Sequence, residues 1–303
     1  MLSRVVFIIL HWTLLVLADS RTTSALDITI YSNNVRYAAS RRGRGRDELP
    51  WKIRKHGVVD AIKSQSGVDP ILIGLQEVTH AQLKDILKGL NKKNSEDDRR
   101  WTFFGVGRDN GHKKGEYSPI LYNTAEWNLL NGTYKWLSFT PDKPSKYPGA
   151  SKKRIVTMGT FSHVKTGKVV NFVNTHLDHR SVKSREYSAK LIIQYIKSIP
   201  NYFPTFLCGD FNSLDTDKAY ATFSHYMVDA SHVAEKKYDT NLKTFSGFGN
   251  GTSYSIDFIW SPMDTNDNSG TNALSYTVLD NLFDEGHRFS DHRPVMARYS
   301  VTS

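Results

Sequence analysis

Apolar runs typical of buried strands alternate with helical patterns along the first part of the chain. Alternation over residues 26–31 and the short apolar run 71–75 each predict a strand. Apolar positions within residues 51–64 recur at helical spacing, and a second helix with an apolar stripe is predicted after Thr79, which can cap it. This order of strand, helix, strand and helix predicts an α/β protein.

Shorter predicted strands, separated by turn residues, follow from residue 101 onward. A clear helical face lies over residues 182–199, where Pro200 ends the helix and a further strand leads to Gly209. This second strand–helix–strand pattern predicts two related halves that pack as one domain over residues 26–303. The other predicted strands are 101–104, 120–122, 127–130, 154–161, 169–174, 255–260, 276–279 and 295–299.

An acid and an amide follow the end of the strand that leads to Gly209. Side chains two residues apart on an extended backbone point to the same side, so Asp210 and Asn212 can project together. A carboxylate can orient or deprotonate water and an amide can hold a phosphoryl oxygen, which suits hydrolysis of a phosphate ester. Taken alone, this short motif also fits a strand end followed by an Asx turn.

Polar residues recur at the ends of the other predicted strands. Asn34, Glu77 and Asp291 offer oxygen ligands without a cysteine cluster, a set that suits Mg²⁺ or Mn²⁺ better than structural zinc. The full set of polar residues at strand ends is Asn34, Glu77, His176, Asp178, Asp210, Asn212, Asp257, Asp291 and His292.

Two histidines in this set supply side chains that titrate near neutral pH. A carboxylate can fix the tautomer and charge of an imidazole, and the candidates are Glu116 for His176 and Asp257 for His292. A structural hydrogen bond explains either histidine taken alone. The whole set, recurring at strand ends, points instead to an active site.

Residues 1–25 have the pattern of a secretory signal peptide. Arg4 precedes an apolar stretch, and small residues follow at its exit, where cleavage after Ala18 or after Ala25 fits the pattern. A membrane anchor is the alternative, but the apolar run is too short and too interrupted to span a bilayer comfortably. The mature chain is therefore expected to be secreted, with no stable membrane insertion.

The charge and cysteine content fit an exported protein that acts on anionic compounds. The net charge of +10 favours polyanionic substrates or surfaces, although charge alone does not separate nucleic acid from phospholipid headgroups. Cys208 is the only cysteine, so no internal disulfide can form, and it is expected to be an inert buried thiol. Sequons at Asn131 and Asn250 are compatible with export.

The densest basic run follows Asn34 and contains Arg41, Arg42, Arg44 and Arg46. It fits a solvated loop, because no aromatic residue is interleaved with the arginines. It also fits a contact with a phosphate backbone that extends from the active site. Both interpretations remain open at this point.

Six motifs occur in order, at residues 33–36, 75–78, 174–178, 209–212, 256–258 and 290–294. Together they resemble the endonuclease/exonuclease/phosphatase superfamily, which includes deoxyribonuclease I, abasic-site endonucleases, deadenylases, inositol-polyphosphate phosphatases and neutral sphingomyelinases. The resemblance covers nearly all of the mature chain. Within the superfamily, residues 107–111 and 115–120 are similar to a secreted branch whose motifs do not define a substrate.

The resemblance implies a four-layer α/β sandwich, in which two mixed β-sheets lie face to face with helices on the outside. It also implies a divalent-metal phosphoesterase whose site lies at the sheet edges. Glu77 matches the main ligand of Mg²⁺ or Mn²⁺, with Asn34 and Asp291 beside it. The implied catalytic residues are Glu116, His176, Asp210, Asn212, Asp257 and His292, and the implied substrate-binding residues are Arg154, Asp178 and Arg185.

From the sequence we expect a secreted, monomeric phosphodiesterase that depends on Mg²⁺ or Mn²⁺. Among phosphodiesterases, a nuclease that acts on DNA or RNA is the favoured interpretation. The alternative is a phosphatase or a sphingomyelinase-type phospholipase that acts on phosphorylated headgroups or inositol phosphates. A binding protein with an inactive site is a third reading. It is disfavoured because every matched catalytic position holds the expected residue type.

Overall fold

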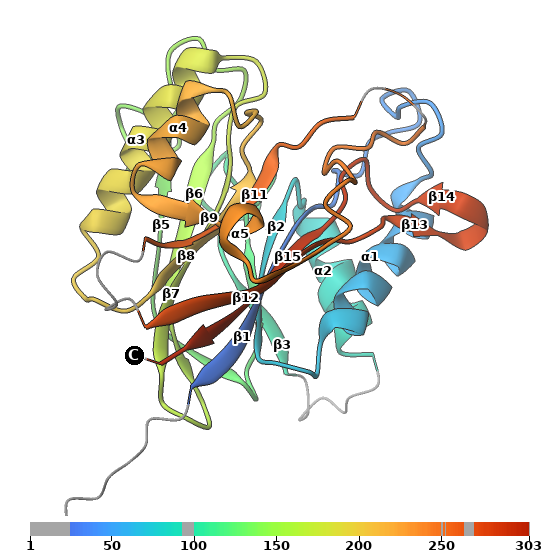
Figure 1. The fold of residues 1–303 in the computed structure, drawn as a ribbon. Coiled ribbons are helices and arrows are strands. Elements are labelled where there is room, and N and C mark those ends of the chain that lie inside the picture. Colours follow the sequence, from blue (N-terminus) through green and yellow to red (C-terminus); the bar gives the residue numbers. More distant parts are fainter. Residues whose placement is uncertain (1–24, 93–99, 250, 252, 264–269, 303) are drawn as a thin grey trace, which may run out of the picture.

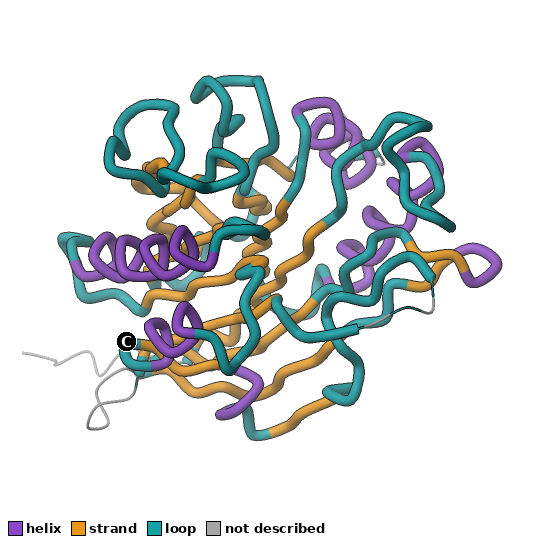
Figure 2. The backbone as a smooth tube through the Cα atoms, turned by 90° about the horizontal axis from the view of Figure 1, so that it is seen from above, coloured by secondary structure: helices purple, strands orange, loops and turns teal. Residues whose placement is uncertain are grey.

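The computed structural model describes residues 25–92, 100–249, 251, 253–263 and 270–302. Two large mixed sheets lie face to face, with helices on both outer sides (Figure 1, Figure 2). The predicted four-layer α/β sandwich is therefore confirmed. Residues 1–24 of the predicted signal peptide and Asn250 of the second sequon lie outside the described residues.

The two sheets have seven and six strands, and a two-stranded hairpin lies apart from them. In spatial order, the first sheet contains β10 (Lys236–Tyr238), β12 (Thr271–Val278), β15 (Val295–Val301), β1 (Leu26–Asn34), β2 (Ile71–Gln76), β4 (Ile120–Asn123) and β3 (Trp101–Phe104). The second contains β5 (Trp127–Trp136), β6 (Ile155–His163), β7 (Val169–His176), β8 (Thr205–Asp210), β11 (Asp257–Pro262) and β9 (Met227–Asp229). The hairpin consists of β13 (Leu282–Phe283) and β14 (His287–Arg288).

The longer helices form the two outer layers, whereas the short helix α5 (Ala230–Val233) contacts β12 of the first sheet and β11 of the second. Helices α1 and α2 pack on the first sheet through residues such as Ile62 and Ile86, and α3 and α4 pack on the second through Ile192 and Phe223. None of the helices in the described ranges is long and apolar enough to cross a bilayer. The helices are α1 (Trp51–Gln65), α2 (His80–Leu90), α3 (Val182–Lys197), α4 (Lys218–Ser224), α5 (Ala230–Val233) and the 3-10 helix η1 (Asp284–Gly286).

The core between the sheets is made of large apolar side chains from both of them. Ile28 and Tyr299 from the first sheet meet Trp127, Phe172 and Phe206 from the second, and all five are fully buried. Each apolar side chain of this size stabilises the fold by about 1.5–3 kcal/mol when it leaves water. The sandwich therefore depends on the period-two alternation that predicted its strands.

Local sequence signals explain where several elements begin. Thr79 caps α2 as predicted, and it forms a reciprocal capping box with Gln82. The side chain of Ser181 accepts a hydrogen bond from the Ser184 N–H at the start of α3. Strand β5 is longer than predicted, and β12 begins at Thr271 rather than at residue 276. The unpredicted elements α4, α5, β9, β10, β13 and β14 have only two to seven residues, too few to carry a periodic pattern.

The direction of the strands brings six chain segments to one edge of the sandwich. Strands β1 and β2 are parallel, with Asn34 opposite Gln76, and β7 and β8 are parallel, with His176 opposite Asp210. Because β15 is antiparallel to β1 and β11 is antiparallel to β8, both begin where their neighbours end. The predicted strand-end residues therefore converge.

Buried amides join the two sheets just below this edge. Gln76 of β2 donates to the Asn174 side chain of β7 at 2.8 Å, and Asn174 donates to the Leu75 carbonyl at 2.8 Å. Neutral hydrogen bonds of this kind each contribute about 0.5–1.5 kcal/mol when both partners are buried. They also fix the position of one sheet relative to the other.

The two sheets approach each other closely at Gly74 of β2. A Cβ atom at this position would lie 2.3 Å from Cys208 Sγ and 2.9 Å from Asn174 Cγ. Cys208 is fully buried, as predicted, and burial raises the pKa of its thiol to about 12. Glycine is therefore required here by the spacing of the layers.

We expect Gly74→Ala to destabilise the protein by about 1–3 kcal/mol, because the extra methyl group overpacks the space between the sheets. Urea unfolding measures the loss. Gly43→Ala is the matched control, since its new Cβ would lie 3.6 Å from the nearest atom. Equal stability of the two variants would contradict the close approach of the sheets.

Candidate active site

The strand ends enclose a pocket of about 480 Å³. Its lining contains carboxylates and histidines, and it also contains a cationic wall formed by Arg108, Lys152 and Arg154. Asn34 and Asp257 lie behind this wall and are fully buried. The lining residues are Arg36, Tyr37, Glu77, Arg108, Glu116, Lys152, Arg154, His176, His179, Asp210, Asn212, Phe245, Tyr254, Ile256, Asp291 and His292.

Glu77 lies directly after β2 in a left-handed backbone conformation, with φ 60°. Its carboxylate accepts hydrogen bonds from the Asn34 side chain at 3.2 Å and from the Tyr37 N–H at 3.1 Å. Burial raises the pKa of Glu77, but the hydrogen bond from the Tyr37 N–H and the charge of Arg36 together lower it by more, so the pKa lies below its ordinary value. Glu77 is therefore a carboxylate at neutral pH.

Asn34 connects two carboxylates rather than standing beside one. Its amide nitrogen also donates to Asp210 at 2.9 Å, while its oxygen accepts from the Arg36 N–H at 2.9 Å. The side-chain oxygen of Asn34, which was predicted to bind a metal ion, therefore accepts a hydrogen bond from the backbone in this arrangement. Asn34 thus sets the distance between Glu77 and Asp210.

The carboxylate oxygens near Arg36 are suitable ligands for a hard divalent cation. Glu77 and Asp291 each lie 4.0 Å from the same Arg36 guanidinium, so two carboxylates already converge on one positive charge. Carboxylate ligands of this kind suit Mg²⁺ or Mn²⁺. The buried group Asp210, Asp257 and His292 also has ligand atoms within 4.8 Å of one another, but His292 Nδ1 is engaged by Asp257.

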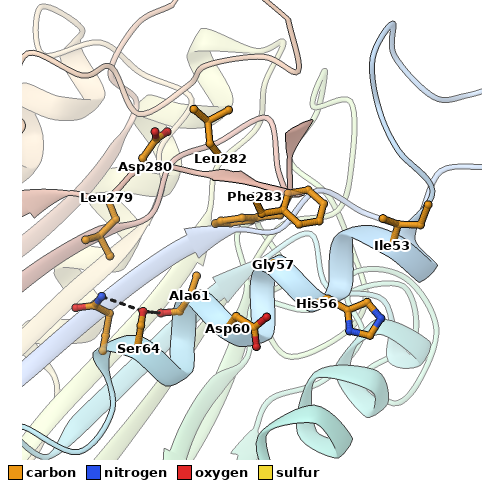
Figure 3. A pocket seen from close by; sticks show the side chains of 12 residues that line it. Ile53, His56, Gly57, Asp60, Ala61, Ser64, Leu279, Asp280, Leu282 and Phe283 are labelled. Atoms are coloured by element: carbon orange, nitrogen blue, oxygen red, sulfur yellow. Dashed lines mark hydrogen bonds between the residues drawn. The ribbon is translucent and has the colours of Figure 1, made fainter. Parts of the chain in front are cut away.

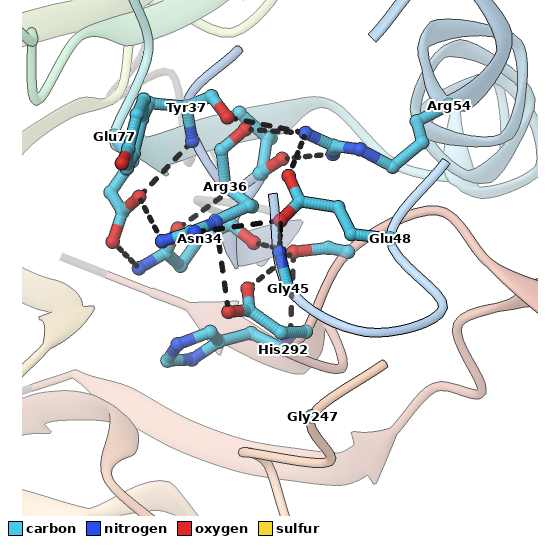
Figure 4. Close-up of polar contacts among 12 residues, drawn as sticks. Asn34, Arg36, Tyr37, Gly45, Glu48, Arg54, Glu77, Gly247 and His292 are labelled. Atoms are coloured by element: carbon cyan, nitrogen blue, oxygen red, sulfur yellow. Dashed lines mark hydrogen bonds and ion pairs between the residues drawn. The ribbon is translucent and has the colours of Figure 1, made fainter. Parts of the chain in front are cut away.

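A fully buried arginine holds the loops that carry these donors (Figure 4). Arg54 of α1 lies 3.5 Å from Glu48, which in turn lies 3.4 Å from Arg36. Its remaining N–H groups donate to the carbonyls of Val35, Arg36, Tyr37, Leu49 and Phe289 at 2.7–3.3 Å. The segments after β1 and before β15 are therefore tied to one side chain.

Two histidines flank Asp210 and carry different charges. His292 Nδ1 lies 2.9 Å from Asp257, as predicted, and its Nε2 lies 3.8 Å from Asp210. Burial lowers the pKa of His292, but Asp257 and Asp210 raise it well above the ordinary value. His176 Nε2 lies 3.3 Å from Asp210, and its pKa is lowered by burial and by the Arg154 charge.

Asp210 is the acidic centre of this arrangement. It is 1% exposed, and burial raises its pKa to about 7, with His292 acting in the opposite direction. Asn212 has φ 47°, and its N–H donates to Asp210 at 2.9 Å. The Asn212 side chain donates one hydrogen to the Leu177 carbonyl at 3.1 Å, which leaves its second amide hydrogen for a ligand.

The cationic wall contains an arginine with unused donors. Arg154 is 4% exposed, its Nε lies 3.8 Å from the Asp178 carboxylate, and within the described residues its Nη1 atom has no hydrogen-bond partner. Burial and the neighbouring Arg108 lower the pKa of Arg154 to about 10, so it remains a cation at neutral pH. Buried donors of this kind are costly unless a ligand satisfies them, and a phosphate oxygen is the matching acceptor.

Glu116 does not orient His176 as the sequence suggested. Its carboxylate forms an ion pair with Arg108 at 2.7 Å, whereas the close partner of His176 is Asp210. Glu116 still lines the pocket, where it holds Arg108 beside Arg154. The reason is that Arg108 is a cation and binds the Glu116 carboxylate more strongly than a neutral imidazole does.

Asp178 and Arg185 also differ from their expected role, because neither lines the pocket. Asp178 is fully buried and accepts hydrogen bonds from the Ser151 hydroxyl and from the N–H groups of Ser151, Lys152, Arg180 and Ser181. Arg185 donates to the Asp178 carbonyl at 3.0 Å. Both residues therefore shape the pocket wall instead of touching a substrate.

Several lining residues had no assigned role in the sequence. Arg36 belongs to the motif at residues 33–36 and His179 directly follows the motif at residues 174–178, so position was the only signal. Phe245 and Tyr254 stack at 4.8 Å beside His292, although nothing in their local sequence marks them as a pair. Contacts made across a loop cannot be inferred from spacing alone.

A larger groove, of about 690 Å³, lies elsewhere on the molecule (Figure 3). It runs between α1 and the segment that contains the β13–β14 hairpin, with Ile53, Ala61 and Phe283 in its wall. None of the site residues predicted from the sequence lines it. Chemistry, rather than volume, therefore identifies the smaller pocket as the site.

The model of the endonuclease/exonuclease/phosphatase family matches residues 34–292 of the sequence. The chain belongs to this family. Members hydrolyse phosphate esters and generally depend on a divalent metal ion, so the protein is a phosphoric ester hydrolase. A comparison with curated proteins finds no match.

Solved structures of family members are similar over nearly their whole length. A family protein from Bacteroides thetaiotaomicron is 29% identical, with a TM-score of 0.80 over 92% of this chain and 99% of that one. A mannosyl-6-phosphatase from the same species is 30% identical, with a TM-score of 0.79 over 90% and 99%. D. rerio TDP2 in complex with a single-strand DNA product is 16% identical, with a TM-score of 0.65 over 90% and 98%, and shows the fold alone.

We expect Asp178→Asn to lower the free energy of unfolding by about 2 kcal/mol near neutral pH. Burial raises the pKa of Asp178, but hydrogen bonds from Ser151, Ser181 and Arg180 lower it to about 2. Its stabilisation is therefore complete above the ordinary pKa of 3.8 and is lost as the pH falls through about 2.

Urea unfolding near pH 6 and near pH 3 measures this effect. The difference between the native protein and the variant should shrink by about half at the lower pH, since Asp178 then binds a proton in the unfolded chain while it is still ionised in the folded protein. Asp60→Asn, at an exposed position, is the control. A difference that stays constant with pH would show that Asp178 is not a depressed carboxylate.

Proposed function

We propose that the protein is a secreted, Mg²⁺- or Mn²⁺-dependent phosphatase that releases phosphate from small phosphorylated sugars or similar polyols. The observation that carries the proposal is the combination of cationic and acidic side chains in one small pocket. Arg108, Lys152 and Arg154 line the same space of about 480 Å³ as Glu77, Asp210 and Asp291, a size that suits a small molecule. A phosphate monoester is a dianion and needs more cationic donors than a diester.

The metal would be held by Glu77 and Asp291, with Asn34 fixing the Glu77 carboxylate. When bound, such an ion polarises a phosphoryl oxygen and neutralises the charge that develops on it. Arg36 lies between the same two carboxylates and keeps them close together. The donor set is therefore organised before an ion arrives.

The side chains around Asp210 would prepare the attacking water. Asp210 accepts the proton of a water molecule placed in line with the ester bond. Protonated His292 and the free amide hydrogen of Asn212 donate to phosphoryl oxygens, which favours the transition state over the ground state. The Nη1 donor of Arg154, which has no partner among the described residues, takes the remaining oxygen.

Two arguments favour a phosphatase over the nuclease expected from the sequence. The cationic wall offers its donors inside the pocket, next to the position of the phosphate. In addition, a solved family member that is 30% identical over 90% of this chain is a mannosyl-6-phosphatase. Similarity at that level supports the proposal for the same class of substrate.

A nuclease remains the second candidate because of two specific observations. The stacked pair Phe245 and Tyr254 borders the pocket, where it could hold a base. The basic loop after β1 is largely exposed, and Arg41, Arg42 and Arg46 extend from it. Both features would engage a nucleic acid that continues beyond the cleaved phosphate.

We expect the purified protein, with Mg²⁺ or Mn²⁺, to release phosphate from mannose 6-phosphate at least about tenfold faster than it cleaves DNA or RNA, because only the monoester uses the whole cationic wall. Phosphate release and gel electrophoresis of nucleic acids measure the two activities, and a chelator should abolish both. Cleavage of nucleic acid without phosphate release would establish the nuclease instead.

We expect Glu77→Gln to reduce activity by at least about 100-fold, since even an outer partner of a metal ligand can contribute this much. The variant retains size and hydrogen bonding but loses the anionic ligand. Calorimetric titration with Mn²⁺ should show weaker binding, and the melting temperature serves as the control for folding. Unchanged activity at saturating Mn²⁺ would exclude Glu77 as a ligand.

A further inference from the structure

His179 occupies the mouth of the pocket and has no role in the mechanism described above. It is exposed and lines the pocket together with Lys152 and Arg154. The backbone around His179 is fixed by Asp178, the residue before it. The Asp178 carboxylate accepts hydrogen bonds from the N–H of Arg180, the residue after His179, and from the N–H of Lys152 on another segment. An exposed side chain on a rigid backbone is well suited to contact a substrate.

The hydrogen bond between Arg154 and His179 determines where the imidazole carries its proton. Arg154 Nη2 lies 3.1 Å from His179 Nδ1, and a guanidinium can only donate, so Nδ1 must accept. The Ser151 hydroxyl lies 3.3 Å from the same nitrogen but donates to Asp178 at 2.7 Å. The proton of the neutral ring is therefore on Nε2.

Burial and the positive charge of Arg154 keep the imidazole of His179 neutral. Burial and the Arg154 charge lower the pKa of His179, with Asp178 acting in the opposite direction. A neutral imidazole whose Nδ1 lone pair is occupied has one function left, which is to donate from Nε2. His179 consequently cannot serve as a general base in this arrangement.

Depth within the pocket indicates which part of the substrate faces His179. Asp210 and His176 are 1% and 5% exposed, and Arg154 is 4% exposed, so the phosphate-binding groups lie at the bottom. His179 lies at the solvent side of Arg154. A group that reaches His179 is therefore the alcohol part of the ester, beyond the phosphate.

We propose that His179 selects substrates by donating its Nε2 hydrogen to an oxygen of the esterified alcohol. The chemical class that satisfies this donor is a phosphate ester of a polyhydroxy compound, such as a sugar, which carries hydroxyl oxygens next to the ester. The inference rests on the proposed phosphatase function and narrows its substrate class. Arg154 has a second role here, because it fixes the tautomer of His179.

Variants of His179 distinguish this role from that of an ordinary surface histidine. The amide nitrogen of Gln is three bonds from Cβ, as is imidazole Nε2, whereas the amide nitrogen of Asn corresponds to Nδ1. Gln therefore keeps the donor to the substrate, while Asn and Ala remove it. His225→Gln, at an exposed position on the end of α4, is the matched control.

Kinetics with two substrates test the proposal. With mannose 6-phosphate, His179→Ala and His179→Asn should raise KM about five- to tenfold, the effect of one lost neutral hydrogen bond, with kcat unchanged. His179→Gln should stay within about twofold of the native protein. Phenyl phosphate has no oxygen besides its ester group, so its kinetics should not change in any variant.

A second measurement does not require turnover. In protein labelled with ¹⁵N-histidine, the resonances missing from His179→Gln identify this ring. They should report a protonated Nε2 and a lone pair on Nδ1, and the Nε2 resonance should move when mannose 6-phosphate is added. If this response occurs without hydrolysis, the inference holds while the proposed phosphatase function fails.

Three results would overturn the inference. One is an Nδ1-protonated ring, or an Nε2 resonance that ignores mannose 6-phosphate, whether or not the ester is hydrolysed. Another is an unchanged KM for mannose 6-phosphate in His179→Ala. The third is an equal loss on both substrates, which would mean that His179 acts on the phosphate and would leave the phosphatase function intact.

Discussion

The buried guanidinium of Arg54 is the interaction on which the geometry of the site depends. An arginine without contact to water is costly unless its charge is balanced and its donors are hydrogen bonded. Here Glu48 balances the charge, and backbone carbonyls from two distant segments take the donors. Because these carbonyls bind the same side chain, the loop after β1 and the loop before β15 cannot move independently of each other. They form one rigid unit around the proposed metal ligands.

This rigid unit explains how carboxylates can be concentrated at one edge without separating. Glu77, Asp210 and Asp291 would repel one another in an open site. Arg36, the Asn34 amide and His292 lie among them and compensate the charge locally. The same pocket also contains Arg108, Lys152 and Arg154, so a phosphate ester that enters it meets cationic side chains as well as the carboxylates.

The sequence predicted the features that depend on periodicity and on strand ends. The α/β class and the long strands follow from the apolar pattern, the sandwich from the family resemblance, and the convergence of Glu77, His176, Asp210 and His292 from where those strands end. The pairing of His292 with Asp257 was also predicted correctly. These features are local in origin, since each strand carries its own signal.

Features that arise from competition between side chains were beyond the sequence. Glu116 was expected beside His176 but binds Arg108, and Asp178 was expected at the substrate but is saturated by backbone N–H groups. Such outcomes depend on which donor is nearest in three dimensions. The short elements between β8 and β12 were missed for a different reason, because they are stabilised by packing rather than by their own pattern.

The pairing of β1 with β15 has a consequence for the timing of activity. The first strand of the domain obtains its antiparallel partner only from the last segment of the chain, which also carries Asp291 and His292. A chain that has not yet placed β15 in the first sheet therefore also lacks Asp291 and His292 in the pocket. The active site therefore becomes complete only at the folding step that adds β15 to the first sheet.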